Sequence, residues 1–254
     1  MPWVRTYVEP EPQRVNRWLA QSGVCSRREA DSLIARGLVS IDGQRVDDAG
    51  RRIAPGQTLT LADEAGLGGG FTAVLNKPVG YVSAQPEPGQ TPAARLLTAA
   101  GLWGEALADP PARDTSLAPL GRLDRDSRGL LLLSADGVLA KAVIGPSSTL
   151  DKEYRVRVAG PIDERKLALL RSGLSLEGRR LKPARVTPAG EQQLRFVLQE
   201  GRNRQLRRMC DLVGLRVVDL LRVRIGPLRL ADLPEGRWRP LRTEERAALL
   251  RGLP

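Results

Sequence analysis

The residues best suited to chemistry lie together in the stretch GRLDRDSRGLLLLSADG, residues 121–137. Two aspartates are set among arginines, as Arg122-Leu123-Asp124-Arg125-Asp126, shortly before four consecutive leucines. Gly121 permits a tight turn ahead of this segment, and a buried leucine strand would hold it rigidly. A carboxylate among guanidinium groups stays ionised, so Asp124 suits the role of a nucleophile or base and not of an acid. The alternative is a structural ion pair between Asp124 and a neighbouring arginine.

Three further segments carry polar groups that could join Asp124. NKPVGYVSA at 76–84 places Lys77 after a predicted strand, although Lys-Pro-x-Gly is also typical of a simple turn. KEYRVRV at 152–158 places Tyr154 on one strand face with two valines, a pattern typical of a core tyrosine. EGRNRQLRRMC at 200–210 sets arginines at the start of a predicted helix. The stretch 200–229 holds eight arginines and three acids, which favours a surface that faces phosphates over an ordinary solvated face.

The composition limits the possible chemistry and partners. Lys and Arg total 40 against 29 acids, a net charge of +11, and 35 of these cations are Arg, which binds phosphate in a planar, bidentate way. The chain contains no histidine, which excludes an imidazole base and His-based zinc motifs. Cys25 and Cys210 are isolated, so they indicate neither a metal cluster nor a disulfide framework. The charge favours nucleic acid as the partner over a merely basic surface, and we expect a cytoplasmic protein with no cofactor, no metal and no membrane segment.

Residues 14–61 form a small unit that we expect to fold by itself. Apolar spacing predicts a helix from Val15 that ends near Gly23, and a second helix begins at Ser26 with a capping box to Glu29. The stretch VSIDGQRV then predicts a hairpin. The motif RVNRWLAxxGVxSRREAxxLIxxGxVxIDGxxV closely resembles the alpha-L (S4-like) RNA-binding domain. The resemblance implies that four arginines meet RNA phosphates, namely Arg17, Arg27, Arg28 and Arg36.

The remaining chain divides into a tail, a linker and a larger domain. Residues 1–13 end in EPEP and are interpreted as a disordered tail, and 62–70 as a flexible glycine-rich linker. In residues 71–254 strands adjoin strands as often as they alternate with helices, which favours an α+β fold. Residues 85–119 are rich in Pro, Gly and Ala and predict an irregular surface insertion.

Taken together, the motifs of residues 14–241 resemble the RsuA/RluB/RluF group of bacterial ribosomal RNA pseudouridine synthases, and they are most similar to its RluF-like branch, which modifies large-subunit ribosomal RNA. The motifs that carry the resemblance are GRLDRDSRGLLLLSADG, LNKPVGYVSA, DKEYRVRV and EGRNRQLRRMCDLVGLRVVDLLRVRIGPL. It implies a mixed, largely antiparallel sheet with flanking helices around a central cleft. It also implies a monomer that acts on ribosomal RNA, either free or in a pre-ribosomal particle.

The resemblance implies a role for individual residues. Asp124 would be the nucleophile at the ribose of a uridine, Tyr154 would lie against the uracil ring, and Arg207 would pair with Asp124. Arg122 would enter the RNA where the uridine leaves the stack. The other expected RNA-binding residues of the larger domain are Lys77, Lys152, Asn203, Arg204 and Arg208.

Two other aspartates of this stretch are given local roles, and two other functions stay open. Asp126 is interpreted as a residue that caps or pairs locally, and Asp136 as a turn residue. The first open alternative is a non-catalytic ribosome assembly factor. The second is a glycosidase or nuclease that uses Asp124 and Asp126 as a carboxylate pair.

Overall fold

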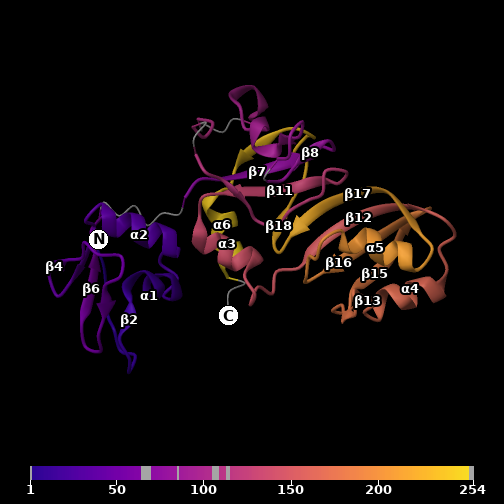
Figure 1. Cartoon of the computed structure of the whole chain (residues 1–254). Helices are drawn as coiled ribbons and strands as arrows, with labels where there is room; N and C mark the ends of the chain where they lie inside the picture. Colours follow the sequence, from indigo (N-terminus) through magenta and orange to yellow (C-terminus); the bar gives the residue numbers. More distant parts are fainter. Residues whose placement is uncertain (1, 64–69, 85, 105–108, 113–114, 252–254) are drawn as a thin grey trace. The chain divides into compact units, whose positions relative to one another are not determined.

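The computed structural model describes residues 2–63, 70–84, 86–104, 109–112 and 115–251 (Figure 1). Contacts within the chain divide it into two compact units. The first comprises Met1–Phe71 with Ala135–Ala140, and the second comprises Thr72–Ser134 with Lys141–Pro254. Most of the expected linker, residues 64–69, lies outside the described residues. No helix among the described residues is long and apolar enough to cross a bilayer.

The first unit packs two helices against a four-stranded antiparallel sheet of order β1-β6-β3-β4. The Ser26 side chain accepts a hydrogen bond from the Glu29 amide, and the Glu29 carboxylate accepts one from the Ser26 amide, so the predicted capping box is confirmed. The expected hairpin is also present. Its elements are α1 (Val15–Gln21), α2 (Arg27–Ala35), β1 (Trp3–Thr6), β2 (Gln13–Arg14), β3 (Val39–Ile41), β4 (Gln44–Arg45), β5 (Arg52–Ile53) and β6 (Thr58–Leu61).

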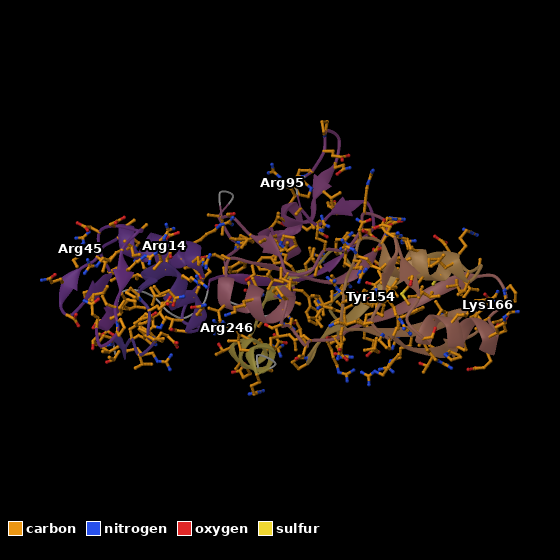
Figure 2. All side chains as sticks on the ribbon, turned by 60° about the horizontal axis from the view of Figure 1, so that its bottom comes forward. Arg14, Arg45, Arg95, Tyr154, Lys166 and Arg246 are labelled. Carbon is orange, nitrogen blue, oxygen red and sulfur yellow. The ribbon has the colours of Figure 1, made fainter. Side chains whose placement is uncertain are left out.

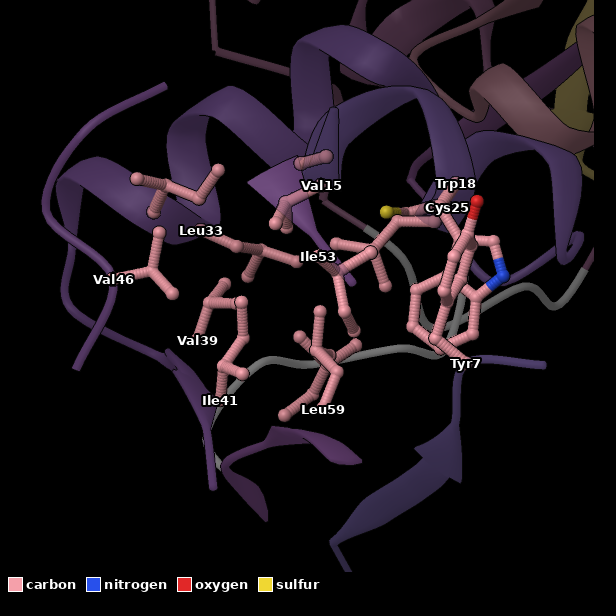
Figure 3. Close-up of a cluster of buried hydrophobic side chains, with 14 residues drawn as sticks. Tyr7, Val15, Trp18, Cys25, Leu33, Val39, Ile41, Val46, Ile53 and Leu59 are labelled. Atoms are coloured by element: carbon pink, nitrogen blue, oxygen red, sulfur yellow. The ribbon is translucent and has the colours of Figure 1, made fainter. Parts of the chain in front are cut away.

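A cluster of buried apolar side chains holds this first unit together (Figure 3). Figure 3 shows Val15, Leu33, Ile53 and Leu59 converging from the helices and the strands. Burying such side chains removes apolar surface from water, which stabilises the fold by about 25 cal/mol for each Å² buried. The apolar side chains of α2, Ala30, Leu33 and Ile34, are all buried in this cluster.

The prediction of a disordered tail is wrong for the first residues of the chain. Strand β1 pairs with β6 along its whole length, with Trp3 opposite Leu61. Tyr7 follows this strand, is buried, and packs edge-on against Trp18 with ring centroids 5.4 Å apart. The short run WVRTY thus supplies a strand and a core aromatic residue. The adjacent EPEP sequence obscured this signal, because proline and acids dominate the composition of the segment.

The second unit is built on a nine-stranded, mostly antiparallel sheet, which confirms the α+β fold. Its main order is β15-β16-β12-β17-β11-β7-β19, with β10 paired to β11 and β18 to β17. Figure 1 shows the buried strands β7 and β11 side by side. The strands are β7 (Thr72–Lys77), β10 (Ala118–Pro119), β11 (Arg128–Ser134), β12 (Lys152–Ala159), β15 (Arg185–Gly190), β16 (Gln193–Leu198), β17 (Arg216–Ile225), β18 (Leu228–Arg229) and β19 (Trp238–Pro240).

Three helices and several short elements complete the described part of this unit, while a fourth helix, α3, begins in the first unit and ends in the second. Helix α4 packs on β15 and α5 packs on β17. The expected insertion 85–119 contains only short elements among its described residues, and 85, 105–108 and 113–114 lie outside them. The remaining elements are α3 (Gly137–Ile144), α4 (Glu164–Arg171), α5 (Gln205–Leu212), α6 (Thr243–Leu250), β8 (Tyr81–Val82), β9 (Thr91–Pro92), β13 (Ser175–Leu176), β14 (Arg179–Arg180), and the 3-10 turns η2 (Ala93–Leu96) and η3 (Ala99–Gly101).

A network of ion pairs crosses β12, β16 and β17. The Arg224 guanidinium bonds both oxygens of Asp151, at 2.6 and 3.1 Å, and one oxygen of Glu153, at 3.0 Å. Arg195 adds two bonds to Glu153, at 2.7 and 2.9 Å. The Arg195 hydrogen bonds, assisted by those from Arg224, lower the pKa of Glu153 to about 2. These ionised contacts connect three strands of the sheet through their side chains.

Candidate active site

Asp124 lies in a turn between β10 and β11. The Ser127 amide donates to the Asp124 carbonyl at 3.1 Å, and Leu123 and Ser127 are both buried. The Asp124 side chain remains 30% exposed. The leucines that follow form the buried interior of β11. The turn leads directly into this buried strand, which holds Asp124 in place while its side chain stays partly accessible to solvent.

The NKPVGYVSA segment supports this turn from the other side. The Gly80 amide donates to the Arg125 carbonyl at 2.8 Å, and Arg125 Nε donates to the Gly80 carbonyl at 3.2 Å. The Ser83 hydroxyl donates to the Leu123 carbonyl at 2.6 Å and accepts from the Leu123 amide at 2.9 Å. One buried hydroxyl thus satisfies both backbone groups of the residue that precedes Asp124. The sequence does not predict this role of Ser83, because a serine after a strand has no distinctive local pattern.

Ser83→Ala is expected to destabilise the protein by about 1–3 kcal/mol, because both backbone groups of Leu123 become buried without a partner. Thermal unfolding would measure this loss. Ser116, which is exposed, provides a matched Ser→Ala control that we expect to change stability by less than about 0.5 kcal/mol. Equal melting temperatures for both variants would contradict the support assigned to Ser83.

Asp124 and Tyr154 line the same pocket. The pocket has a volume of about 110 Å³, which is on the scale of one aromatic ring, since an engineered cavity of ~150 Å³ accommodates benzene. Tyr154 stands on β12 (Figure 2), is only 8% exposed, and shares a buried face with Val156 and Val158. The remaining lining comes mainly from 198–207, together with Arg122, Leu123, Ser127 and Leu220.

The loop before α5 presents arginines to this pocket in a constrained conformation. Arg204 has φ +47°, a left-handed backbone that costs free energy for a residue with a side chain. Gln205 is buried and holds the loop, because its side chain accepts from the Arg202 amide at 3.0 Å and donates to Glu200 at 3.0 Å. The strained residue therefore stays in place at the rim of the pocket.

The expected pairing of Arg207 with Asp124 is wrong in this structure. Arg207 Nε lies 3.3 Å from the Asp126 carboxylate, and Arg207 Nη2 donates to the Asp126 carbonyl at 2.7 Å. The cation found beside Asp124 among the described residues is Arg204, at 3.8 Å, and Arg204 also bonds both oxygens of Asp126. The reason is geometric: the turn brings Asp126, two residues beyond Asp124, to the beginning of α5.

Asp126 has a pairing role, but its partners Arg204 and Arg207 lie about eighty residues away, so the expectation of a local partner is wrong. Burial by itself raises its pKa, but the Arg204 hydrogen bond and the nearby Arg207 charge outweigh burial, so the pKa lies below its ordinary value.

Asp136 is also structural, because it accepts hydrogen bonds from the amides of Val138 and Leu139 at the start of α3. The described residues contain no group of three or more His, Cys, Asp and Glu side chains arranged to hold a metal ion.

Two residues expected to bind RNA are buried, so that expectation is wrong for Lys77 and Lys152. Lys77 is 0% exposed and donates to the carbonyls of Pro78 and Tyr81 at 2.8 and 2.9 Å. Lys152 donates to the carbonyls of Val143 and Leu150 at 3.2 and 3.1 Å. Burial lowers the pKa of each lysine to about 8. Both ammonium groups are used to tie backbone segments together.

Most of the other predicted RNA-binding residues are accessible. Arg122, Asn203 and Arg204 are exposed around the pocket, and Arg208 is partly exposed and bonds Glu177 at 3.0 Å. In the first unit, the four arginines expected to meet RNA are all exposed on or beside the two helices, namely Arg17, Arg27, Arg28 and Arg36.

Comparisons with known proteins identify the family of this chain. A model described as RNA pseudouridylate synthase matches residues 72–212, which is more than half of the chain. The dual-specificity RNA pseudouridine synthase RluF of Escherichia coli K12 is 33% identical over 236 residues, covering 91% of this chain and 76% of the relative. The chain belongs to the RNA pseudouridine synthase family. A model of the S4 domain matches residues 13–59, so the RNA pseudouridine synthase also carries an S4 domain, as its motif predicts.

Two further similarities agree with this assignment. The ribosomal small subunit pseudouridine synthase A of Pseudomonas aeruginosa is 37% identical to this RNA pseudouridine synthase over 238 residues, covering 91% of this chain and 98% of the relative. A crystal structure of a pseudouridylate synthase matches with a TM-score of 0.63 and 28% identity, covering 93% of this chain and 99% of the other. As an RNA pseudouridine synthase, the protein isomerises uridine within an RNA chain.

Proposed function

We propose that this enzyme converts one specific uridine of large-subunit ribosomal RNA to pseudouridine, acting as a monomer in the cytoplasm with Asp124 as the nucleophile. The observation that carries the proposal is the pocket shared by Asp124 and Tyr154. An ionisable carboxylate and a phenol ring line one small cavity, and arginines stand at its entrance. That set of groups suits a reaction on one extruded nucleotide.

The reaction assigns a task to each of these groups. Asp124 acts at the ribose, and the N-glycosidic bond breaks while uracil stays in the pocket. The base then rotates and its carbon 5 bonds to the sugar in place of Asp124, after which the carbon-5 proton leaves and nitrogen 1 takes up a proton. Tyr154 lies against the ring and keeps it from diffusing away. Every atom of the uridine is retained in the product except for the exchange of that proton, so the residues mainly orient and enclose the base.

Extracting the base from the RNA costs a few kcal/mol, which contacts to the protein must offset. The exposed Arg122, Asn203 and Arg204 surround the entrance and are suited to phosphate and base contacts. Arg208 lies in the first turn of α5 and adds a further charge. We assign these residues to the RNA that flanks the target uridine.

Mapping pseudouridine in defined RNAs tests this function. The purified protein would be incubated separately with large-subunit rRNA, small-subunit rRNA, a pre-ribosomal particle and tRNA, and each product sequenced after chemical marking of pseudouridine. We expect one modified uridine in large-subunit rRNA. Modification only of small-subunit rRNA or tRNA would contradict the proposed substrate, and free uracil as the product would contradict isomerisation.

The four arginines of the first unit are proposed to bind RNA phosphates. Replacing Arg17, Arg27, Arg28 and Arg36 together with Gln is expected to weaken RNA binding and to flatten its salt dependence. Each lost phosphate contact lowers the slope of log K against log salt by about 0.7–0.9. Arg51→Gln, on the exposed surface of the same unit, provides the control. An unchanged slope in the quadruple variant would show that these arginines do not contact the phosphates.

A further inference from the structure

A single buried guanidinium lies beneath the turn that carries Asp124. Arg222, on β17, is 1% exposed and is among the largest fully buried side chains. Its Nε donates to the Leu130 carbonyl at 2.7 Å, its Nη2 to the Gly121 carbonyl at 3.0 Å, and its Nη1 to the Arg122 carbonyl at 3.4 Å. Within the described part of the chain no carboxylate forms an ion pair with it. All of its hydrogen bonds therefore go to the backbone.

These carbonyls belong to the two ends of one loop. Gly121 and Arg122 precede Asp124, and Leu130 follows it inside β11. The planar fork of a guanidinium can donate in several directions at once, so one side chain fastens both ends of the loop. The ammonium group of a lysine is a single point of donation, so it could bond one end of the loop but would not bridge both ends.

The backbone at both ends is shaped to admit this contact. Gly129 has φ +106°, and a Cβ at this position would lie 2.4 Å from the Arg222 carbonyl oxygen, which is too close for any side chain. Gly121 has φ +90°, a left-handed conformation that disfavours other residues. Arg222 and Gly129 are also register partners in the short parallel pairing of β17 with β11. The two glycines therefore let β17 approach the loop closely.

Keeping this cation buried is costly for the fold. Removing a charge from water without an opposite charge nearby is unfavourable. Burial lowers the pKa values of Lys77 and Lys152, and the positive charge of Arg222 lowers them further. An apolar side chain of similar size would fill the same volume without that cost. The carbonyl contacts at the ends of the Asp124 loop give a specific reason for a guanidinium at this position.

We propose that Arg222 is a positioning residue that fixes the Asp124 carboxylate relative to the pocket by fastening both ends of its loop. The proposal rests on the proposed role of Asp124 in the reaction. Arg222 is too deeply buried to meet RNA, so it acts only through the backbone of the loop. A displacement of about 1 Å in a catalytic group can lower the rate about 10²-fold. The effect should therefore be on turnover and not on RNA affinity.

The test compares Arg222→Lys with wild type in single-turnover assays at saturating RNA, together with RNA affinity and thermal unfolding. We expect the saturating rate to fall about 10²-fold, while the dissociation constant for RNA stays within about two-fold. Arg216→Lys, on the exposed start of the same strand, is the matched control and should retain the wild-type rate. Leu167→Ala, in the core under α4, controls for loss of stability alone and should lower the melting temperature without lowering the rate.

Several outcomes would overturn the proposal. A wild-type rate in folded Arg222→Lys would do so, as would an equal loss of rate in Leu167→Ala. If Arg222→Lys fails to fold, Gly121→Ala provides a second disturbance of the same loop end, and a wild-type rate in that folded variant would also refute the proposal. Asp124→Asn is assayed in parallel: full activity there refutes the proposed nucleophile, whereas an inactive Asp124→Asn beside an active Arg222→Lys refutes only the positioning role.

Discussion

Asp124→Asn is expected to lower the rate of pseudouridine formation by at least about 10⁴-fold, the scale of loss seen when a covalent nucleophile is removed. Asparagine has nearly the same shape as aspartate but lacks the negative charge, so it cannot act at the ribose. The pocket and its arginines remain, and RNA affinity should change little. The rate of pseudouridine formation under saturating RNA measures the effect directly, and a filter-binding assay measures the affinity.

Two further Asp→Asn variants make this experiment specific. Asp211→Asn, exposed on α5, is the matched control and should retain normal activity. Asp126→Asn removes the partner of Arg204 and Arg207 and should reduce activity less than Asp124→Asn. If Asp126→Asn were inactive while Asp124→Asn still turned over, the nucleophile would have to be reassigned to Asp126.

Arg224→Gln is expected to destabilise the protein by about 2–3 kcal/mol at neutral pH. The change leaves Asp151 and part of Glu153 without their main cation, and loss of one partner of a fully buried pair costs ~3–5 kcal/mol. The smaller figure applies because these side chains keep some contact with solvent. Chemical denaturation measures the loss, and Arg155→Gln, exposed on the neighbouring β12, is the control for removing one arginine from this sheet.

The same network makes stability depend on acid pH with a definite sign. The pKa of Glu153 falls from 4.5 in the unfolded chain to about 2 in the folded protein, mainly through the Arg195 hydrogen bonds, and the pKa of Asp151 is lowered by Arg224. A depressed carboxyl pKa stabilises the fold at pH values above the unfolded pKa, and this contribution disappears as pH falls through the folded pKa. The difference between wild type and Arg224→Gln should therefore shrink between pH 4.5 and 2. A constant difference across that range would contradict the ionic origin.

The sequence predicts the components of the site better than their connections. The placement of Tyr154 on a strand and of Asp124 in a loop before buried leucines could be predicted because both are local patterns, whereas their roles in the reaction came from the family resemblance. The partner of Arg207 could not, because it depends on where the turn at 124–127 meets α5, some eighty residues later. Lys77 was misjudged because every residue of β7 is buried, so the strand shows no alternation that would reveal a lysine turned inward.

Arg222 and Ser83 were missed for a related reason. Both bond backbone atoms of distant residues. Every residue has a backbone carbonyl, so the residue types of the partners do not reveal such bonds. The glycines at 121 and 129 are the visible part of that arrangement, yet from sequence alone each is consistent with an ordinary turn. Strand β1 was not predicted because the proline and acidic residues that follow it indicated a disordered tail, although its pairing with β6 is regular.

The strand β1 has a practical consequence for dissecting this protein. The S4 match begins at residue 13, so a fragment cut at that point would lack both β1 and Tyr7. The outer side of β6 would then present unpaired amides and carbonyls, and the indole of Trp18 would lose its aromatic neighbour. An open strand edge next to uncovered apolar surface invites self-association. Fragments intended to study RNA binding by the small unit should therefore keep the first twelve residues.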